Sequence, residues 1–317
     1  MPIKVYAAVL VIVAAPALAR ARVDQKTQIH FQGGFGGLIA RLVSLPDHEG
    51  LTVTKEVDGN RGFMRFGDFG RLIDLDTGQS HGLDFAGKTY TDGAIDEARR
   101  AFEDGRIETA RSRVRHEVSR KWTNWEAELE VRWSGKVELI NGWDTHEQIV
   151  TVTVYEEGST LEQSGGFVLT ADVWIGPQVP AIREVREFEQ RYVKAIYGNA
   201  LDVETIRMSA AMDAQPALRK AMNAWVEHRK GLEGSVIRVT MTFEAIPGPA
   251  VPLEQAEDDL PGGAGFRCFL RSTKKREPGN GRELWMDLRT EILRATGVSS
   301  GDFAIPAGFV QFTQHCQ

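Results

Sequence analysis

The chain of 317 residues is 42% hydrophobic and 26% charged, an ordinary composition for a globular protein. Its formal net charge at pH 7 is -6, which argues against nucleic acid as a partner because phosphate binding needs a basic face. The length allows one large domain or two small ones, and we find no repeat of fixed period.

Residues 1–19 are expected to form a secretory signal peptide. Lys4 precedes an apolar run that ends in Pro16 and in the small residues Ala17 and Ala19. This run is too short to span a membrane, but it matches the hydrophobic core and cleavage site of a signal peptide. We therefore expect residues 20–317 to be exported to the periplasm as one soluble domain that does not span the membrane.

Residues 23–90 are predicted to form a β-meander, because apolar and polar residues alternate over 51–57 and turn signals follow at hairpin spacing. These turn signals lie at 58–60, 67–70, 77–78 and 86–87. The spacing favours antiparallel pairing over crossover connections. A helix is expected next, with Asp92 as its N-cap and an apolar stripe that continues to Val118.

The second half of the chain is predicted to alternate between strands and helices. Apolar and charged residues alternate over 125–133, which is typical of a strand with one buried face. Amphipathic helices are expected at 181–197 and, with a break at Pro216, at 202–230. Further strands are expected at 136–140, 146–157, 165–175, 234–246, 266–273 and 283–293. A segment rich in Pro, Gly and acidic residues near 247–265 is expected to be a flexible loop.

Two glycine-containing motifs are better explained as turns than as sites of chemistry. The glycines of residues 33–37 lack the Lys and Ser/Thr of a phosphate-binding loop. Residues 297–301 match G-x-S-x-G with Ser299 in the nucleophile position, but Asp302 follows directly and only His315 remains downstream. The strand–turn–helix context of that motif is therefore missing. We predict no catalytic residue and expect that the protein is not an enzyme.

Asp74 and Asp76 lie two residues apart on one face of a predicted strand, with His81 and Asp84 nearby. A metal site needs three or four converging ligands. Asp76 precedes a Thr-Gly turn and is explained as a turn former. We therefore predict no metal site, and the sequence indicates no cofactor.

Cys268 and Cys316 are the two cysteines of the chain. Export would place them in an oxidising compartment, where a disulfide between them is allowed. The alternative is that Cys316 belongs to a loose C-terminal tail. Neither cysteine is part of a C-x-x-C motif, so a redox or metal role is not indicated.

The predicted strand over 165–175 has two half-apolar faces. One face carries Phe167, Leu169, Ala171, Val173 and Ile175, and the other carries Val168, Thr170, Asp172 and Trp174. A strand of this kind is expected to pack on both sides, against the core and against a helix or a ligand. Ordinary packing on both sides is favoured over a reactive role for Asp172.

Three stretches of the chain resemble the lipoprotein-carrier (LolA-like) superfamily of exported bacterial proteins. Residues 70–91 are similar to its paired strands that end in a K-T-Y-like step before a helix. Residues 232–245 resemble a later strand of that superfamily, and residues 299–312 resemble its F-x-I-P-x-G ending.

The resemblance implies an α+β fold: a large curved antiparallel β-sheet, an unclosed half-barrel, with helical insertions that cover its concave face. It implies a binding or carrier protein for a hydrophobic ligand, either a lipid or a lipidated protein. The alternative is an envelope protein–protein interaction module without a small ligand.

Such a carrier would hold its ligand between the sheet and a helical lid. The candidate ligand-binding residues are Trp133, Trp143, Val152, Phe167, Leu169 and Val173. The candidate lid and hinge residues are Trp174, Gly176, Pro177 and Pro180, which lie where the strand over 165–175 gives way to the helix over 181–197.

Overall fold

A single large β-sheet organises the protein. The computed structural model describes residues 20–32, 50–97, 100, 125–197, 216–230, 232–247, 282–298 and 303–312. These residues form a sheet of 12 strands in the order β12-β6-β5-β4-β3-β2-β1-β11-β10-β9-β8-β7. The two ends of this order do not pair with each other, so the predicted large, unclosed sheet is confirmed.

The strands are β1 (Arg20–Phe31), β2 (Leu51–Asp58), β3 (Arg61–Phe66), β4 (Phe69–Asp74), β5 (Gln79–Asp84), β6 (Thr89–Ala94), β7 (Trp125–Ile140), β8 (Trp143–Glu156), β9 (Gly165–Gly176), β10 (Ser235–Pro247), β11 (Glu283–Val298) and β12 (Val310–Gln311). Neighbouring strands are antiparallel except for β12, which pairs with β6 in the parallel direction. The sheet is therefore mixed. The chain reaches β6 through residues 303–309 and not through a tight hairpin, so no turn imposes the antiparallel direction.

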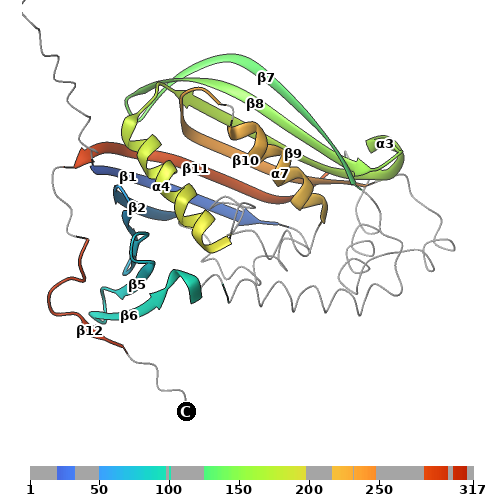
Figure 1. Cartoon of the computed structure of the whole chain (residues 1–317). Helices are drawn as coiled ribbons and strands as arrows, with labels where there is room; N and C mark the ends of the chain where they lie inside the picture. Colours follow the sequence, from blue (N-terminus) through green and yellow to red (C-terminus); the bar gives the residue numbers. More distant parts are fainter. Residues whose placement is uncertain are drawn as a thin grey trace, which may run out of the picture.

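Two helices cover one face of the sheet, α4 (Pro180–Tyr197) and α7 (Pro216–Lys230), and the short helix α3 (Leu161–Ser164) links β8 to β9. α4 packs on β1, β2 and β11, whereas α7 packs on β7, β8 and β9. Figure 1 shows both helices lying on the same side of the long strands. No helix in the described part of the chain is long and apolar enough to cross a membrane.

Each helix has its own core. Beneath α7, alternate residues of β8, β9 and β10 pack against Trp225, including Val152, Leu169 and Phe243. Beneath α4, Val23 of β1 and Val57 of β2 are among the side chains that pack around Phe188. Every second residue from Phe167 to Ile175 of β9 is buried, as the alternating pattern predicts. Val168 and Trp174, on the other face of β9, are buried as well, so this strand packs on both faces.

Phe188 lies at the centre of the α4 interface and is fully buried. Its ring packs against the bare backbone of Gly62 on β3, where an added Cβ would lie 2.3 Å from two ring carbons. The glycine therefore allows the helix to approach the sheet closely at this position.

The meander extends further than predicted. Asp92, the expected helix N-cap, lies within β6 opposite His81, and its carboxylate is 2.6 Å from His81 Nδ1. Gln311 of β12 donates a 2.6 Å hydrogen bond to the same carboxylate. The N-cap prediction is wrong because pairing with β5 continues to Ala94, so the helical residues begin only at Ile95.

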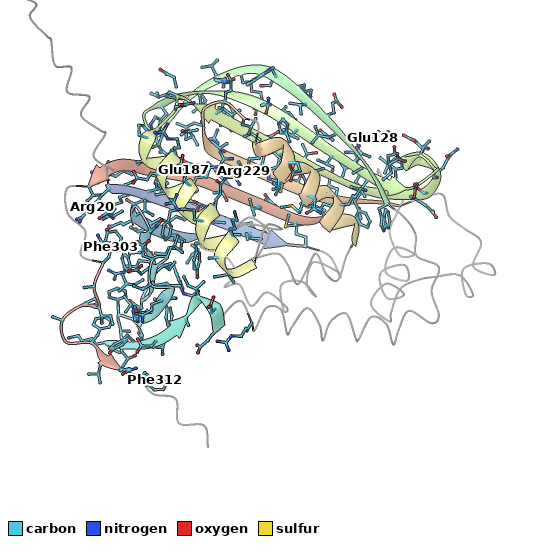
Figure 2. The ribbon with its side chains drawn as sticks, in the orientation of Figure 1. Arg20, Glu128, Glu187, Arg229, Phe303 and Phe312 are labelled. Carbon is cyan, nitrogen blue, oxygen red and sulfur yellow. The ribbon has the colours of Figure 1, made fainter. Side chains whose placement is uncertain are left out.

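The C-terminal segment packs against the meander. The ring of Phe309 packs edge-on against Phe85 at 5.4 Å, and the guanidinium of Arg61 lies 5.4 Å from the ring centre of Phe303. Figure 2 shows Phe303 and Phe312 at this end of the molecule.

Several predicted features lie outside the described residues. These are the signal peptide, the glycines of 33–37, most of the helix after Ile95, the segment 202–215, the loop beyond Pro247, the strand over 266–273, Ser299, Cys268 and Cys316.

The contact between Gly62 and Phe188 gives a first prediction. In Gly62→Ala the new methyl group must displace a fully buried ring, and overpacking of this kind costs about 1–3 kcal/mol. We expect urea denaturation to show a loss of unfolding free energy in this range. Gly297→Ala is the matched control, because a Cβ there meets no atom closer than 3.8 Å. Equal stability of the two variants would contradict the proposed close approach.

Candidate functional site

A buried ion pair links the sheet to α4. Lys55 of β2 has a side chain only 9% exposed, and its Nζ lies 2.6 Å from Oε1 of Glu189 on α4. The same Nζ donates a 3.0 Å hydrogen bond to Oε1 of Gln25 on β1. Lys55 lies between Val53 and Val57, at a position of the strand where the alternating pattern predicts an apolar side chain. This break in the alternation is visible in the sequence, but the predictions above did not use it.

A cavity of about 330 Å³ lies beside this ion pair, between the first half of α4 and strands β1, β10 and β11. Four cationic side chains contribute to its lining, Lys55, Arg183, Arg186 and Arg229, together with one carboxylate, Glu189. Nη2 of Arg186 donates a 3.3 Å hydrogen bond to the carbonyl oxygen of Arg229 near the end of α7, which lies beside α4 in Figure 2. We call this space the charged cavity.

A second, more apolar space lies at the other end of α4. It has a volume of about 520 Å³ and separates the last turns of α4 from the meander strands β2 to β6. Phe66 and Phe69 stack on each other at its edge with ring centres 6.1 Å apart. Apolar residues of both walls line it, namely Val53, Met64, Phe66, Phe69, Leu83, Tyr90, Tyr192, Val193, Ile196 and Phe312. We call this space the aromatic groove.

The two spaces are neighbours along β2. Lys55 lines the charged cavity, and Val53, two residues earlier on the same face of the strand, lines the aromatic groove. On α4, Glu189 borders the first space and Tyr192 borders the second. The Lys55–Glu189 ion pair therefore lies on the side of the charged cavity that is close to the groove. Near it, Nη1 of Arg71 donates a 3.2 Å hydrogen bond to the Tyr192 hydroxyl.

The candidate ligand-binding residues from the sequence lie elsewhere. Val152, Phe167, Leu169 and Val173 are buried beneath α7 in the solid core that contains Trp225. Trp143 lies at the tip of the β7–β8 hairpin and packs against the core beneath α4 and against a small cluster that contains Ile140 and Trp174. Trp133 lies on β7 and is 58% exposed. None of the six contributes to the lining of the charged cavity or the aromatic groove.

The candidate hinge residues connect β9 to α4. Gly176 ends β9, Pro177 is exposed, and Pro180 begins α4 and lines the charged cavity. The backbone N–H of Val179 donates a 2.9 Å hydrogen bond to Oγ of the buried Ser235, which anchors this junction to β10. Trp174 lies on the opposite face of the sheet, where the Arg238 guanidinium is 4.8 Å from its ring centre.

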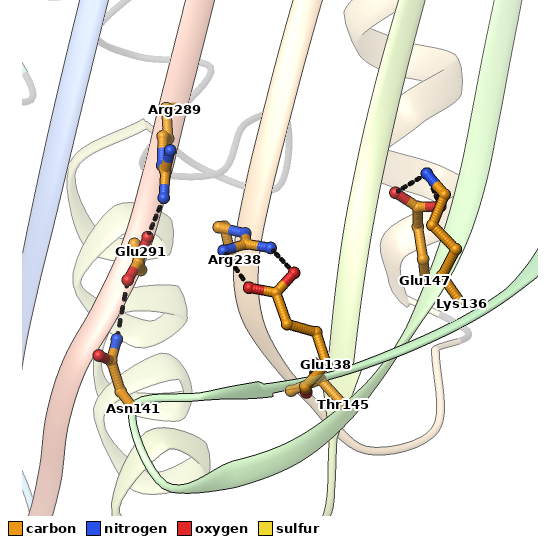
Figure 3. A network of polar contacts seen from close by, with 8 residues as sticks. All are labelled: Lys136, Glu138, Asn141, Thr145, Glu147, Arg238, Arg289 and Glu291. Atoms are coloured by element: carbon orange, nitrogen blue, oxygen red, sulfur yellow. Dashed lines mark hydrogen bonds and ion pairs between the residues drawn. The ribbon is translucent and has the colours of Figure 1, made fainter.

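That opposite face carries a network of ion pairs (Figure 3). Glu138 accepts two hydrogen bonds from Arg238, at 2.7 and 3.1 Å. Asn141 donates to Glu291 at 2.9 Å, and Arg289 donates to the other oxygen of Glu291 at 2.7 Å. The network holds the tip of the β7–β8 hairpin against β10 and β11. These ion pairs are therefore explained by a structural role.

Asp172 and Glu147 form a carboxylate pair on the same face, and their environments move their pKa values apart. Burial, together with the charge of Glu147, raises the pKa of Asp172 above its ordinary value. Burial also acts on Glu147, but hydrogen bonds from Ser134 and Lys136 outweigh it and hold the pKa of this carboxyl below its ordinary value. Nζ of Lys136 lies 3.0 Å from Oε2 of Glu147. Neither carboxylate lines the charged cavity or the groove.

Comparison with known proteins adds no relative from which a site could be transferred. A scan of the chain against models of protein families finds no match, and no curated protein sequence matches it. Within the described ranges, no group of three or more His, Cys, Asp or Glu side chains is placed to hold a metal ion. The charged cavity and the aromatic groove are therefore the candidate functional site.

The raised pKa of Asp172 predicts a pH-dependent stability. The folded state holds the proton more tightly than the unfolded state, where the ordinary value is 3.8, so stability falls as pH rises from 3.8 through the raised folded pKa. Asp172→Asn lacks this ionisation. We expect the difference in unfolding free energy between Asp172→Asn and the original chain to increase as the pH rises through that window. At higher pH the difference should stay constant. Denaturation at several pH values measures this, and a difference that does not vary with pH would contradict it.

Proposed function

We propose that the protein is a periplasmic, non-enzymatic binding or carrier protein for a hydrophobic ligand, either a lipid or a lipidated protein. The observation that carries this proposal is the aromatic groove between α4 and the meander. The proposal includes the LolA-like relationship, the α+β class and the role of α4 as a helical lid over the sheet.

The composition of the groove supports a hydrophobic ligand. Phe69 is 56% exposed and Phe312 is 54% exposed, and both rings line the same space. Large apolar side chains that remain exposed together commonly mark a binding surface. The volumes of about 520 and 330 Å³ lie within the range of roughly 300–1,000 Å³ that is usual for small-molecule sites.

The position of α4 supports a lid. The helix contributes to the walls of both spaces and is joined to β9 by the short segment that contains Pro177. A movement of α4 away from β2 would open the groove towards the charged cavity and admit a ligand. Burial of apolar ligand surface at about 25 cal/mol per Å² would then retain it.

The direct test is to isolate the natural ligand. The full chain is produced with export to the periplasm, purified without detergent and extracted with organic solvent, and the extract is analysed by mass spectrometry. A bound lipid at near-stoichiometric amount is the expected result. The absence of bound lipid, together with no binding of the apolar dye N-phenyl-1-naphthylamine, would overturn the proposal.

A charge in the groove should weaken binding without unfolding the protein. Phe69→Glu removes an apolar side chain whose burial by a ligand is worth about 1.5–3 kcal/mol, so we expect at least a roughly tenfold loss of dye affinity. Trp133→Glu is the matched control, because Trp133 has a similar exposed fraction of 58% but lies on β7. Equal losses in the two variants would place the binding site outside the groove.

The exposed face of β7 supports the alternative, an envelope interaction module. β7 is an edge strand, and Leu129, Trp133, Val137 and Leu139 are exposed along it. In that case a photocrosslinking amino acid at position 137 would form a discrete crosslink to the partner protein in cells. Trp133→Glu would abolish this crosslink, and Phe69→Glu would preserve it. A lipid-free protein with this crosslinking pattern would favour the module over the carrier.

A further inference from the structure

The charged cavity contains a lysine in an unusual position. Lys55 belongs to the face of β2 that carries the buried side chains Val53 and Val57, and its own side chain is only 9% exposed. Lysine is almost never this deeply buried unless it is paired. Its two partners are Gln25, on the neighbouring strand, and Glu189, on α4.

The only charged partner of Lys55 among the described residues therefore sits on the element that we propose to move. If α4 rises from the sheet, Glu189 is carried away from Lys55 while Gln25 stays. A buried ammonium group without a counter-charge is strongly unfavourable. In an open state water can solvate Nζ of Lys55, but a state in which a ligand fills the space and excludes this water needs another negative charge next to Nζ.

The rest of the lining favours the same kind of ligand. Arg183, Arg186 and Arg229 add three cationic groups to the lining, and Glu189 is its one carboxylate. The guanidinium of Arg183 also lies 3.9 Å from the carboxylate of Glu187 on the same helix. Arg186 is held against the end of α7 through the carbonyl of Arg229, which fixes its guanidinium at the cavity wall. Guanidinium groups are suited to carboxylate and phosphate because both offer paired acceptor oxygens.

We propose that the charged cavity binds the anionic head group, carboxylate or phosphate, of an amphiphile whose apolar chain occupies the aromatic groove. This inference rests on the proposed function and adds the chemical class of the ligand. The head group takes the place of Glu189 as the counter-ion of Lys55. Because Val53 and Lys55 are roughly 7 Å apart along one strand face, a single molecule can contact both spaces.

The exchange of counter-ions couples binding to the lid. While Glu189 pairs with Lys55, it holds α4 against β2. When the ligand head group replaces it, Glu189 is released and the helix loses this attachment. A neutral ligand of the same shape offers no replacement charge and binds in competition with the intact ion pair.

The test compares cis-parinaric acid with its methyl ester, two fluorescent molecules with the same chain and different head groups. Both are titrated into the full chain, freed of endogenous lipid, at pH 8. We expect the acid to bind at least tenfold more tightly than the ester. Glu189→Gln removes the competing carboxylate, so this variant should bind the acid several-fold more tightly than the original chain.

A second variant controls for the buried lysine. In Lys55→Met/Glu189→Leu both charges are replaced by apolar groups, which avoids leaving either one unpaired. In this double variant the preference for the acid should fall several-fold, to the part that Arg183, Arg186 and Arg229 provide. A preference for the acid that is undiminished in it would overturn the role of Lys55.

The remaining outcomes separate this inference from the proposed function. Equal affinity of the original chain for acid and ester would overturn the head-group site and leave the hydrophobic carrier standing. Failure to bind either molecule would count against both. Inorganic phosphate alone, titrated calorimetrically, should bind far more weakly than the acid. Comparable affinity would show that the cavity takes a free anion and not an amphiphile.

Discussion

The contact between Phe188 and Gly62 determines where the rest of the site lies. It brings α4 close to the sheet at one point, because a bare backbone on β3 receives a fully buried ring. The helix is straight, whereas the meander turns away from the long strands (Figure 1). The C-terminal turns of α4 are therefore separated from the meander strands, and the aromatic groove lies between them. The charged cavity lies towards the other end of the helix, against the long strands β1, β10 and β11.

The two faces of the sheet use charge in different ways. On the face away from the helices, Glu138, Arg238, Arg289 and Glu291 form partly exposed pairs that fix the β7–β8 hairpin. On the covered face, Lys55 and Glu189 form a pair whose side chains are only 9% and 15% exposed. Exposed pairs contribute little stability each, whereas loss of one partner from a buried pair costs about 3–5 kcal/mol. A charge change at Lys55 therefore has larger consequences than one at Glu138 or Arg289, whose side chains are 45% and 48% exposed.

Much of the fold follows from local patterns in the sequence. The alternation over 165–175 and the amphipathic pattern over 181–197 predict β9 and α4 to within one residue at each end. Periodicity also assigns Leu169 and Val173 to one face and Trp174 to the other, as found. Turn signals predict the meander hairpins, since each hairpin is set by residues adjacent in the chain.

The candidate site could not be predicted in the same way. Strand periodicity separates two faces but does not say which helix covers which part, because this depends on contacts between distant residues. Leu169 and Val173 lie beneath α7, so their apolar face is filled by a core. Lys55 could have been noticed as a charged residue at an apolar position of the alternating pattern. Its role, however, depends on the ion pair with Glu189, which lies 134 positions away in the chain. Asp92 looked like an N-cap because cross-strand pairing cannot be read from local sequence.

The attachments of α4 differ along its length, and this limits how it can move. Its centre is held by Phe188 and Val185, whose burial is lost entirely if the helix leaves the sheet. The backbone N–H of Val179, just before its first residue, is bonded to Ser235. The later turns are held by two exposed polar contacts, from Arg71 to Tyr192 and from Arg191 to the carbonyl of Gly59, and by the buried side chains of Val193 and Ile196. Exposed polar contacts exchange with water at small net cost, whereas buried apolar contacts do not. Lifting these turns from the sheet would therefore expose Val193 and Ile196. Because both residues line the aromatic groove, an apolar ligand in the groove would cover them again and offset this cost.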